Sequence, residues 1–184
     1  HCLDVAAVGR EYLRRHPRLR RFLATAFDLP EPVFVAWFTF FLALHDLGKF
    51  ATSFQAQRPD LLRLLQGPEI ADKTSCSRHD SLGYWFWLEH VQPVLGEEDW
   101  LGLGEAAADI ADYGLGNWAR AVTGHHGRPP LESGLLIDAF SAGDTAAALA
   151  FVARMRELLL GGVPAANAVV DAEHFIAASE RLSW

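Results

Sequence analysis

The chain has 184 residues, of which 51% are hydrophobic and 21% charged, and its formal net charge is −7. This length and composition exclude a disordered or low-complexity chain and fit one globular domain with its own core. The acidic balance argues against a free-standing, sequence-independent DNA-binding module.

Helix-forming residues dominate, since Ala and Leu together number 54 whereas Val, Ile and Thr together number 21. Because β-branched side chains lose rotamer freedom in helices, this ratio favours an all-α fold. Apolar periodicity, ended by Pro and Gly, predicts helices in chain order over residues 3–15, 18–27, 33–46, 60–65, 81–89, 105–113, 117–124, 144–160 and 171–182. We expect Asp144 to be the N-cap of the long helix 144–160. No repeat or long linker interrupts the series, so residues 1–184 are predicted to form a single helical bundle domain.

Two further features bear on where the protein acts. The longest apolar run, Val33 to Leu44, is shorter than the roughly 18 residues that cross a bilayer, so we expect no membrane partner. The two cysteines, Cys2 and Cys76, cannot build a disulfide scaffold and indicate a reducing, cytoplasmic environment. The chain begins with His1, so we expect it to be a piece of a longer protein.

The dipeptide His45-Asp46 lies at the end of the most apolar predicted helix and precedes Leu47-Gly48-Lys49. Because residues 33–44 carry no charge, we expect this helix to be buried on most sides. A carboxylate at its end then costs several kcal/mol unless the charge is paired or bound to a cation. A divalent metal meets that need, imidazole is a common metal ligand, and a carboxylate can bridge two ions. The ordinary alternative is a helix-terminal histidine paired with its neighbour or with solvent.

Three other histidine segments are candidates for the same site. Gly124 and Gly127 flank the doublet His125-His126, loosening the backbone so that both rings can reach one side. His79 stands in Arg78-His79-Asp80-Ser81, and His1 is the first residue. Taken singly, the doublet is an ordinary surface feature, His79 belongs to a polar cluster at a helix start, and His1 has no interpretation. The set is what points to a metal site.

Other conspicuous side chains are expected to be structural. The tryptophans that fall on helical stretches are predicted to pack in the core rather than to stack on bases; they are Trp37, Trp85, Trp87, Trp100 and Trp118. His16, His90 and His174 have no histidine companions and are predicted to be surface or capping residues.

Together, the histidine segments resemble the HD superfamily of metal-dependent phosphohydrolases. In finer detail they resemble the HD nuclease domain of the CRISPR-associated nuclease–helicase of type I systems. The resemblance extends over nearly the whole chain. It rests on His1-Cys2-Leu3-Asp4, His45-Asp46-Leu47-Gly48-Lys49 with Phe54-Gln55, Arg78-His79-Asp80-Ser81, and His125-His126-Gly127-Arg128.

The resemblance implies a site that binds two divalent ions. The first ion would be bound by His1, His45 and Asp46. The second would be bound by Asp46, which bridges the two, and by His79, His125 and His126. The family has one further aspartate in an Asp-Trp-x-x-Ser motif after a late helix, and this chain lacks that motif. We therefore expect this ligand to lie beyond the last residue, and this piece to bind metal incompletely and to have impaired activity.

The implied activity is hydrolysis of phosphodiester bonds in single-stranded DNA during CRISPR type I interference, an antiviral defence. Asp46 and Lys49 are the candidate catalytic residues, and Lys49 and Arg128 are the candidate contacts to the DNA backbone. The alternatives are that Lys49 is only solvated and that Arg128 only braces its loop. The implied partners are helicase domains of the same parent protein, which use ATP, and an RNA-guided surveillance complex. An imidazole-rich site suits iron, manganese, cobalt, nickel or zinc better than magnesium.

Two rival functions remain open at this point. One is an HD-family nucleotide phosphohydrolase, which would release phosphate from small nucleotides without cutting single-stranded DNA. The other is a degenerate HD domain that binds partners and holds no metal.

Overall fold

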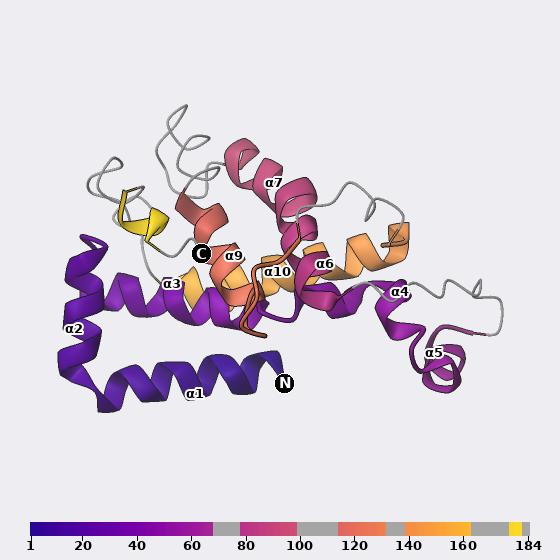
Figure 1. The fold of residues 1–184 in the computed structure, drawn as a ribbon, viewed down its shortest axis with the longest axis horizontal. Coiled ribbons are helices and arrows are strands. Elements are labelled where there is room, and N and C mark those ends of the chain that lie inside the picture. Colours follow the sequence, from indigo (N-terminus) through magenta and orange to yellow (C-terminus); the bar gives the residue numbers. More distant parts are fainter. Residues whose placement is uncertain (68–77, 99–113, 132–138, 163–176, 182–184) are drawn as a thin grey trace.

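The computed structural model describes residues 1–67, 78–98, 114–131, 139–162 and 177–181, and within these ranges the secondary structure is helical, as predicted (Figure 1). The elements are α1 (Cys2–Arg15), α2 (Pro17–Ala26), α3 (Glu31–Leu44), η1 (Leu47–Phe50), α4 (Thr52–Gln55), α5 (Pro59–Gln66), α6 (His79–Phe86), the π-helical η2 (Trp87–Val91), α7 (Gln92–Glu97), α9 (Gly116–Thr123) and α10 (Ala142–Leu160). The predicted helix 105–113 lies outside the described residues, as does most of 171–182.

Helix α3 is the centre of the bundle, and it contacts α1, α2, α9 and α10. Its aromatic side chains Phe34, Phe40 and Phe41 are at most 1% exposed, and Phe41 packs against Trp87 and Trp118. The segment Glu31–Phe50 is long and apolar enough to cross a membrane by length and composition alone, yet 67% of its most apolar window is buried inside the bundle. Burial of this kind explains why the sequence carries so apolar a helix here.

Four of the tryptophans predicted for the core are indeed buried there; they are Trp37, Trp85, Trp87 and Trp118. Trp100 lies outside the described residues. The prediction of a structural role is therefore confirmed for the four tryptophans that can be placed.

The pairing of α1 with α3 brings the first residue of the chain to the end of the central helix. Both helices have 14 residues, and they lie side by side and antiparallel, joined through α2 (Figure 1). Equal length and opposite direction put the start of α1 level with the end of α3, about 21 Å, the length of each helix, from the ends that α2 connects. His1 therefore lies beside His45, with ring centroids 5.3 Å apart.

Several predicted boundaries were wrong, and two of the differences have a clear structural reason. Helix α3 ends at Leu44 rather than Asp46, because the chain turns at His45 and Asp46 into the tight helix η1. Helix α10 is capped by Ser141 and not by Asp144. The Ser141 hydroxyl accepts from the Asp144 backbone N–H, and the Asp144 carboxylate accepts from the Ser141 N–H, which together form a capping box.

Asp144 also ties α10 to the segment that follows η1. Its buried carboxylate accepts hydrogen bonds from the backbone N–H and the hydroxyl of Thr52, at 2.9 and 2.7 Å. Asp144 therefore fixes the start of α10 against the segment that directly follows residues 45–50, which form the HD turn.

Candidate metal centre

Two helix ends present histidines in the same way. His45 follows α3 and His125 follows α9, where the last backbone carbonyls of a helix lack helical partners. In each case Nδ1 donates to the carbonyl three residues earlier, Leu42 at 2.8 Å and Val122 at 3.1 Å. Because a carbonyl only accepts, Nδ1 carries the proton. In both rings Nε2 is therefore the nitrogen that faces the other histidines.

His79 comes from the first turn of α6 and reaches the HD turn through an unusually close backbone contact. A Cβ atom added to Gly48 would lie 1.9 Å from the carbonyl oxygen of His79 and 2.6 Å from the backbone nitrogen of Gly83. No side chain other than hydrogen fits at position 48. The glycine of the His-Asp-x-Gly-Lys motif therefore has a spatial role, since it lets η1 touch α6 beside His79.

The carboxylate of Asp46 lies at the centre of these groups and is only 3% exposed. Its Oδ2 lies 3.1 Å from His45 Nε2 and 3.4 Å from His1 Nε2, and its Oδ1 lies 3.2 Å from His79 Nε2 and 3.7 Å from His125 Nε2. Each carboxylate oxygen thus faces a different pair of imidazoles.

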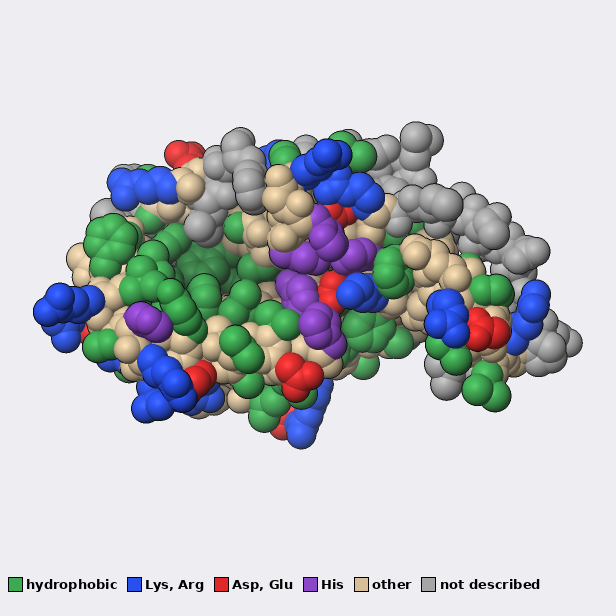
Figure 2. All heavy atoms as spheres, turned by 60° about the horizontal axis from the view of Figure 1, so that its bottom comes forward, with side chains coloured by type: hydrophobic (Ala, Val, Ile, Leu, Met, Phe, Trp, Pro, Cys, Tyr) green, Lys and Arg blue, Asp and Glu red, His purple; other side chains and the backbone are tan. Residues whose placement is uncertain are grey.

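The donor atoms form two groups, within each of which they lie no more than 4.8 Å apart. One group is His1, His45 and Asp46, and the other is His79, His125 and His126. In the second group His79 Nε2 lies 3.1 Å from His126 Nε2 and 3.4 Å from His125 Nε2. The structure thus brings together all six residues that the sequence analysis named as ligands, in the two sets named there. Figure 2 shows histidine side chains gathered on one face around an acidic group, next to a basic one.

The electrostatics of this cluster favour a bound cation. Asp46 Oδ1 is buried and accepts no hydrogen bond, although two imidazole nitrogens face it. Three Nε2 atoms of the second group also face one another, and a proton between two of them leaves the third unsatisfied. A divalent ion accepts lone pairs from carboxylate and imidazole together. The residues present therefore fit a metal site.

The ionisation of the second group in particular favours metal binding. Burial lowers the pKa of His79 and of His125, whereas contact with the Asp46 carboxylate raises the pKa of His45. Burial opposes ionisation of Asp46, but hydrogen bonds from His45 and Lys49 lower its pKa overall. A neutral His79 and His125 beside an ionised Asp46 are the forms that bind a metal ion.

Of the two cationic side chains predicted to act on the substrate, one is in the cluster and one is at its edge. Lys49 Nζ lies 2.7 Å from Asp46 Oδ2, and its side chain is 40% exposed. Arg128 is exposed on the loop that follows His126. His16 and His90 lie apart from the cluster. His16 is exposed at the junction of α1 and α2 and stacks on Tyr12, as predicted, whereas His90 is half-buried within η2 against Phe86 and does not cap a helix. His174 lies outside the described residues.

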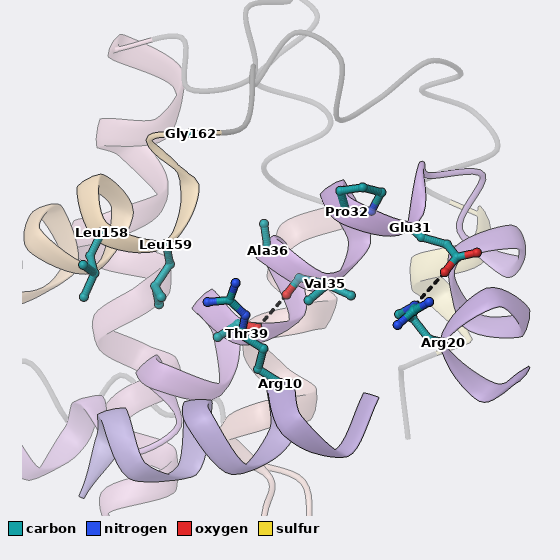
Figure 3. A pocket seen from close by; sticks show the side chains of 10 residues that line it. All are labelled: Arg10, Arg20, Glu31, Pro32, Val35, Ala36, Thr39, Leu158, Leu159 and Gly162. Atoms are coloured by element: carbon teal, nitrogen blue, oxygen red, sulfur yellow. Dashed lines mark hydrogen bonds and ion pairs between the residues drawn. The ribbon is translucent and has the colours of Figure 1, made fainter. Parts of the chain in front are cut away.

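Two cavities differ in what they contain. One of about 490 Å³, between α1, α2, α3 and the end of α10, holds the Arg20–Glu31 ion pair and the Thr39 hydroxyl, which donates to the Val35 carbonyl (Figure 3). None of the predicted site residues lines it. The other, of about 530 Å³, opens beside Asp46 and Lys49. The second cavity therefore adjoins the metal centre, since His1 and Asp46 belong to its lining.

A hydrogen-bonded chain that the sequence analysis missed holds the two histidine segments of the second group together. Asp80 is fully buried and accepts from the Arg78 guanidinium and from the backbone N–H of Ser81. The Ser81 hydroxyl in turn accepts from the N–H of Leu131, at the end of the His125–His126 loop. The signal in the sequence was the polar run around His79, which the sequence analysis interpreted only through its histidine.

Replacing Asp80 with asparagine is expected to destabilise the fold by about 1–3 kcal/mol, because both Arg78 and Ser81 then lose a charged acceptor and one oxygen becomes an NH2 group that cannot accept. Denaturant unfolding measures the change. The matched control is Asp60→Asn, since Arg58 and Asp60 have the same spacing at the start of α5 but are 67% and 61% exposed. We expect no measurable change in the control, and equal effects of the two substitutions would contradict the role given to Asp80.

Comparison with known proteins identifies a family whose matched region includes the residues of this site. The family model described as "Cas3, HD domain" matches residues 1–182. The chain is 35% identical over 140 residues to the CRISPR-associated endonuclease/helicase Cas3 of Escherichia coli, covering 69% of this chain and 15% of that protein. It is 46% identical over 137 residues to the protein of the same name from Thermus thermophilus, covering 70% of this chain and 13% of that protein. No solved structure matches significantly.

The matched region therefore spans less than a sixth of either relative. The family model, in contrast, covers almost every residue of this chain, including all four histidine segments. The chain belongs to the Cas3 HD-domain family.

Proposed function

We propose that this domain is a metal-dependent nuclease that hydrolyses phosphodiester bonds of single-stranded DNA in CRISPR type I interference. Membership of the Cas3 HD-domain family supports a nuclease. The single observation that carries the proposal is the buried carboxylate of Asp46, whose Oδ1 has no hydrogen-bond partner among facing imidazoles.

The residues that would hold metal are the two groups already described, with Asp46 shared between them. A pair of divalent transition-metal ions would supply Lewis acidity and a water of lowered pKa. Among the described residues, the first group offers three ligands, which are His1, His45 and Asp46. The second group offers three imidazoles together with Asp46 Oδ1. We therefore propose weaker metal binding at the His1 group and, as a result, impaired activity of this chain.

The chain's own residues would bind and orient the substrate. Lys49 is partly exposed at the mouth of the cavity and already contacts the carboxylate, so its ammonium group lies where a phosphodiester would approach. Arg128, exposed beyond His126, would contact the next part of the DNA backbone. Both contacts are with phosphate and carry no sequence preference.

The parent protein is proposed to carry helicase domains that use ATP and to act after an RNA-guided surveillance complex has opened its target DNA. The names of both curated relatives join an endonuclease with a helicase, which supports a helicase partner. We propose that the protein acts in the cytoplasm, where a chain with two cysteines stays reduced.

A cleavage assay tests the nuclease function. Circular single-stranded DNA is incubated with the chain and Mn²⁺, Fe²⁺, Co²⁺, Ni²⁺ or Zn²⁺ in turn, with EDTA as the metal-free arm. We expect cutting with at least one of these ions and none with EDTA. His79→Ala is expected to remove the activity, whereas His16→Ala, a histidine outside the cluster, is expected to retain it.

The rival functions give different results in the same assay. Phosphate release from nucleoside triphosphates or cyclic dinucleotides, without cutting of DNA, would identify a nucleotide phosphohydrolase. Absence of both activities together with absence of bound metal would identify a binding domain.

A further inference from the structure

The cavity beside Asp46 is lined by two kinds of side chain. Its charged part is formed by the Asp46 carboxylate and the Lys49 ammonium group, 2.7 Å apart, and its apolar part includes Leu3 and the neighbouring rings of Phe50 and Phe151. Its volume of about 530 Å³ is within the range of small-ligand sites, about 300–1,000 Å³. A nucleotide combines the same two characters, since it has a charged phosphate and a flat, largely apolar base.

The apolar part of the cavity lining includes two aromatic rings. Phe50, in η1, and Phe151, on α10, are each partly exposed, with ring centroids 5.3 Å apart and planes at 40° to each other. Neither ring is fully used in packing, so both present surface to the cavity. Successive bases of a single strand stack on such rings whatever the base, because every base has a π-face.

Two sets of hydrogen bonds fix the position of these rings relative to the Asp46 carboxylate. The hydrogen bonds between Asp144 and Thr52 hold the start of α10 against the segment after η1. The Gln55 amide donates to the carbonyls of Lys49 and Phe50, at 3.1 and 3.0 Å, which holds these two neighbours in place. The ring of Phe50 and the ammonium group of Lys49 are thus adjacent parts of one rigid segment.

We propose that this cavity is a nucleobase subsite, in which the base next to the scissile phosphate stacks against Phe151 and Phe50. The inference rests on the proposed nuclease function and adds to it the side chains that bind the nucleoside. Phe151 is a positioning residue rather than a ligand of the metal centre, so its loss weakens binding of DNA through the base and leaves the phosphate contacts intact.

Fluorescence anisotropy with two labelled strands of equal length tests the proposal. One strand is oligothymidine and the other has the same backbone with abasic tetrahydrofuran residues, both phosphorothioate-linked so that they resist hydrolysis. We expect Phe151→Ala to weaken binding of oligothymidine about fivefold to a hundredfold, the loss of one stacked base, and to leave binding of the abasic strand unchanged. Phe151→Trp is expected to restore the affinity for oligothymidine.

Control variants separate stacking from folding. Phe151→Leu retains apolar bulk without a ring and should weaken oligothymidine binding as Phe151→Ala does. Phe22→Ala removes a ring that is 68% exposed on α2, outside the cavity, and should change nothing. Equal weakening on both strands, or no weakening on either, would overturn the subsite. If the unaltered chain does not cut unmodified single-stranded DNA with any of the metals, that result contradicts the nuclease function and not the subsite.

Discussion

Asp46→Asn is expected to abolish metal binding by the group that contains His1 and to weaken metal binding by the group that contains His79 at least about 100-fold. Loss of a residue that only supports a metal ligand already costs about 10- to 100-fold, and Asp46 is the carboxylate that, among the described residues, faces imidazoles of both sets. Asparagine has the same shape but no charge, and only one of its terminal atoms is an oxygen. Calorimetric titration with Mn²⁺ measures the affinity, and elemental analysis measures the number of bound ions.

Asp4→Asn is the matched control for this substitution. Asp4 lies near the same end of α1, 3.4 Å from the amino group of His1, but its side chain is 86% exposed. We expect unchanged metal content in this variant. Two tightly bound ions in the Asp46→Asn protein would refute the bridging role, and DNA cutting that survives the substitution would refute the catalytic one.

Gly48→Ala is expected to destabilise the protein by about 3 kcal/mol or more, at the upper end of the cost of overpacking. The new methyl group meets backbone rather than a flexible side chain, since the His79 carbonyl would lie 1.9 Å away. In a chain of this size the loss corresponds to a melting temperature lower by about 6 °C or more. Because η1 must move away from α6, we also expect weaker metal binding by the group that contains His79.

The same substitution at Gly143 provides the comparison. A Cβ there would meet only the Ser141 hydroxyl, at 3.7 Å, and alanine is the better helix former, so Gly143→Ala is expected to leave stability unchanged or to raise it by up to about 1 kcal/mol. If Gly48→Ala changes neither the melting temperature nor the metal affinity, the close contact between η1 and α6 is not needed for stability or for the metal site.

Composition and local sequence pattern were sufficient to predict the fold class and the buried central helix. The excess of Ala and Leu predicted the all-α class, and the uncharged run before His45 predicted the buried central helix, because burial selects apolar residues directly. Helix ends were less well predicted. Ser141 and Asp144 are both good capping residues; in the structure Ser141 caps the helix, while the Asp144 carboxylate also accepts from Thr52, a residue 92 positions away.

For the site, the sequence by itself determined which side chains are available and, through the family resemblance, how they group into two sets. Distances were decided only by the tertiary structure. The antiparallel packing of α1 on α3 brings His1 to His45, and the glycine contact between η1 and α6 brings His79 to Asp46. The sequence offered the polar run around His79 but not its partner Leu131, and it gave no sign that Phe50 and Phe151 pair, because these residues come from separate segments and meet only in the folded bundle.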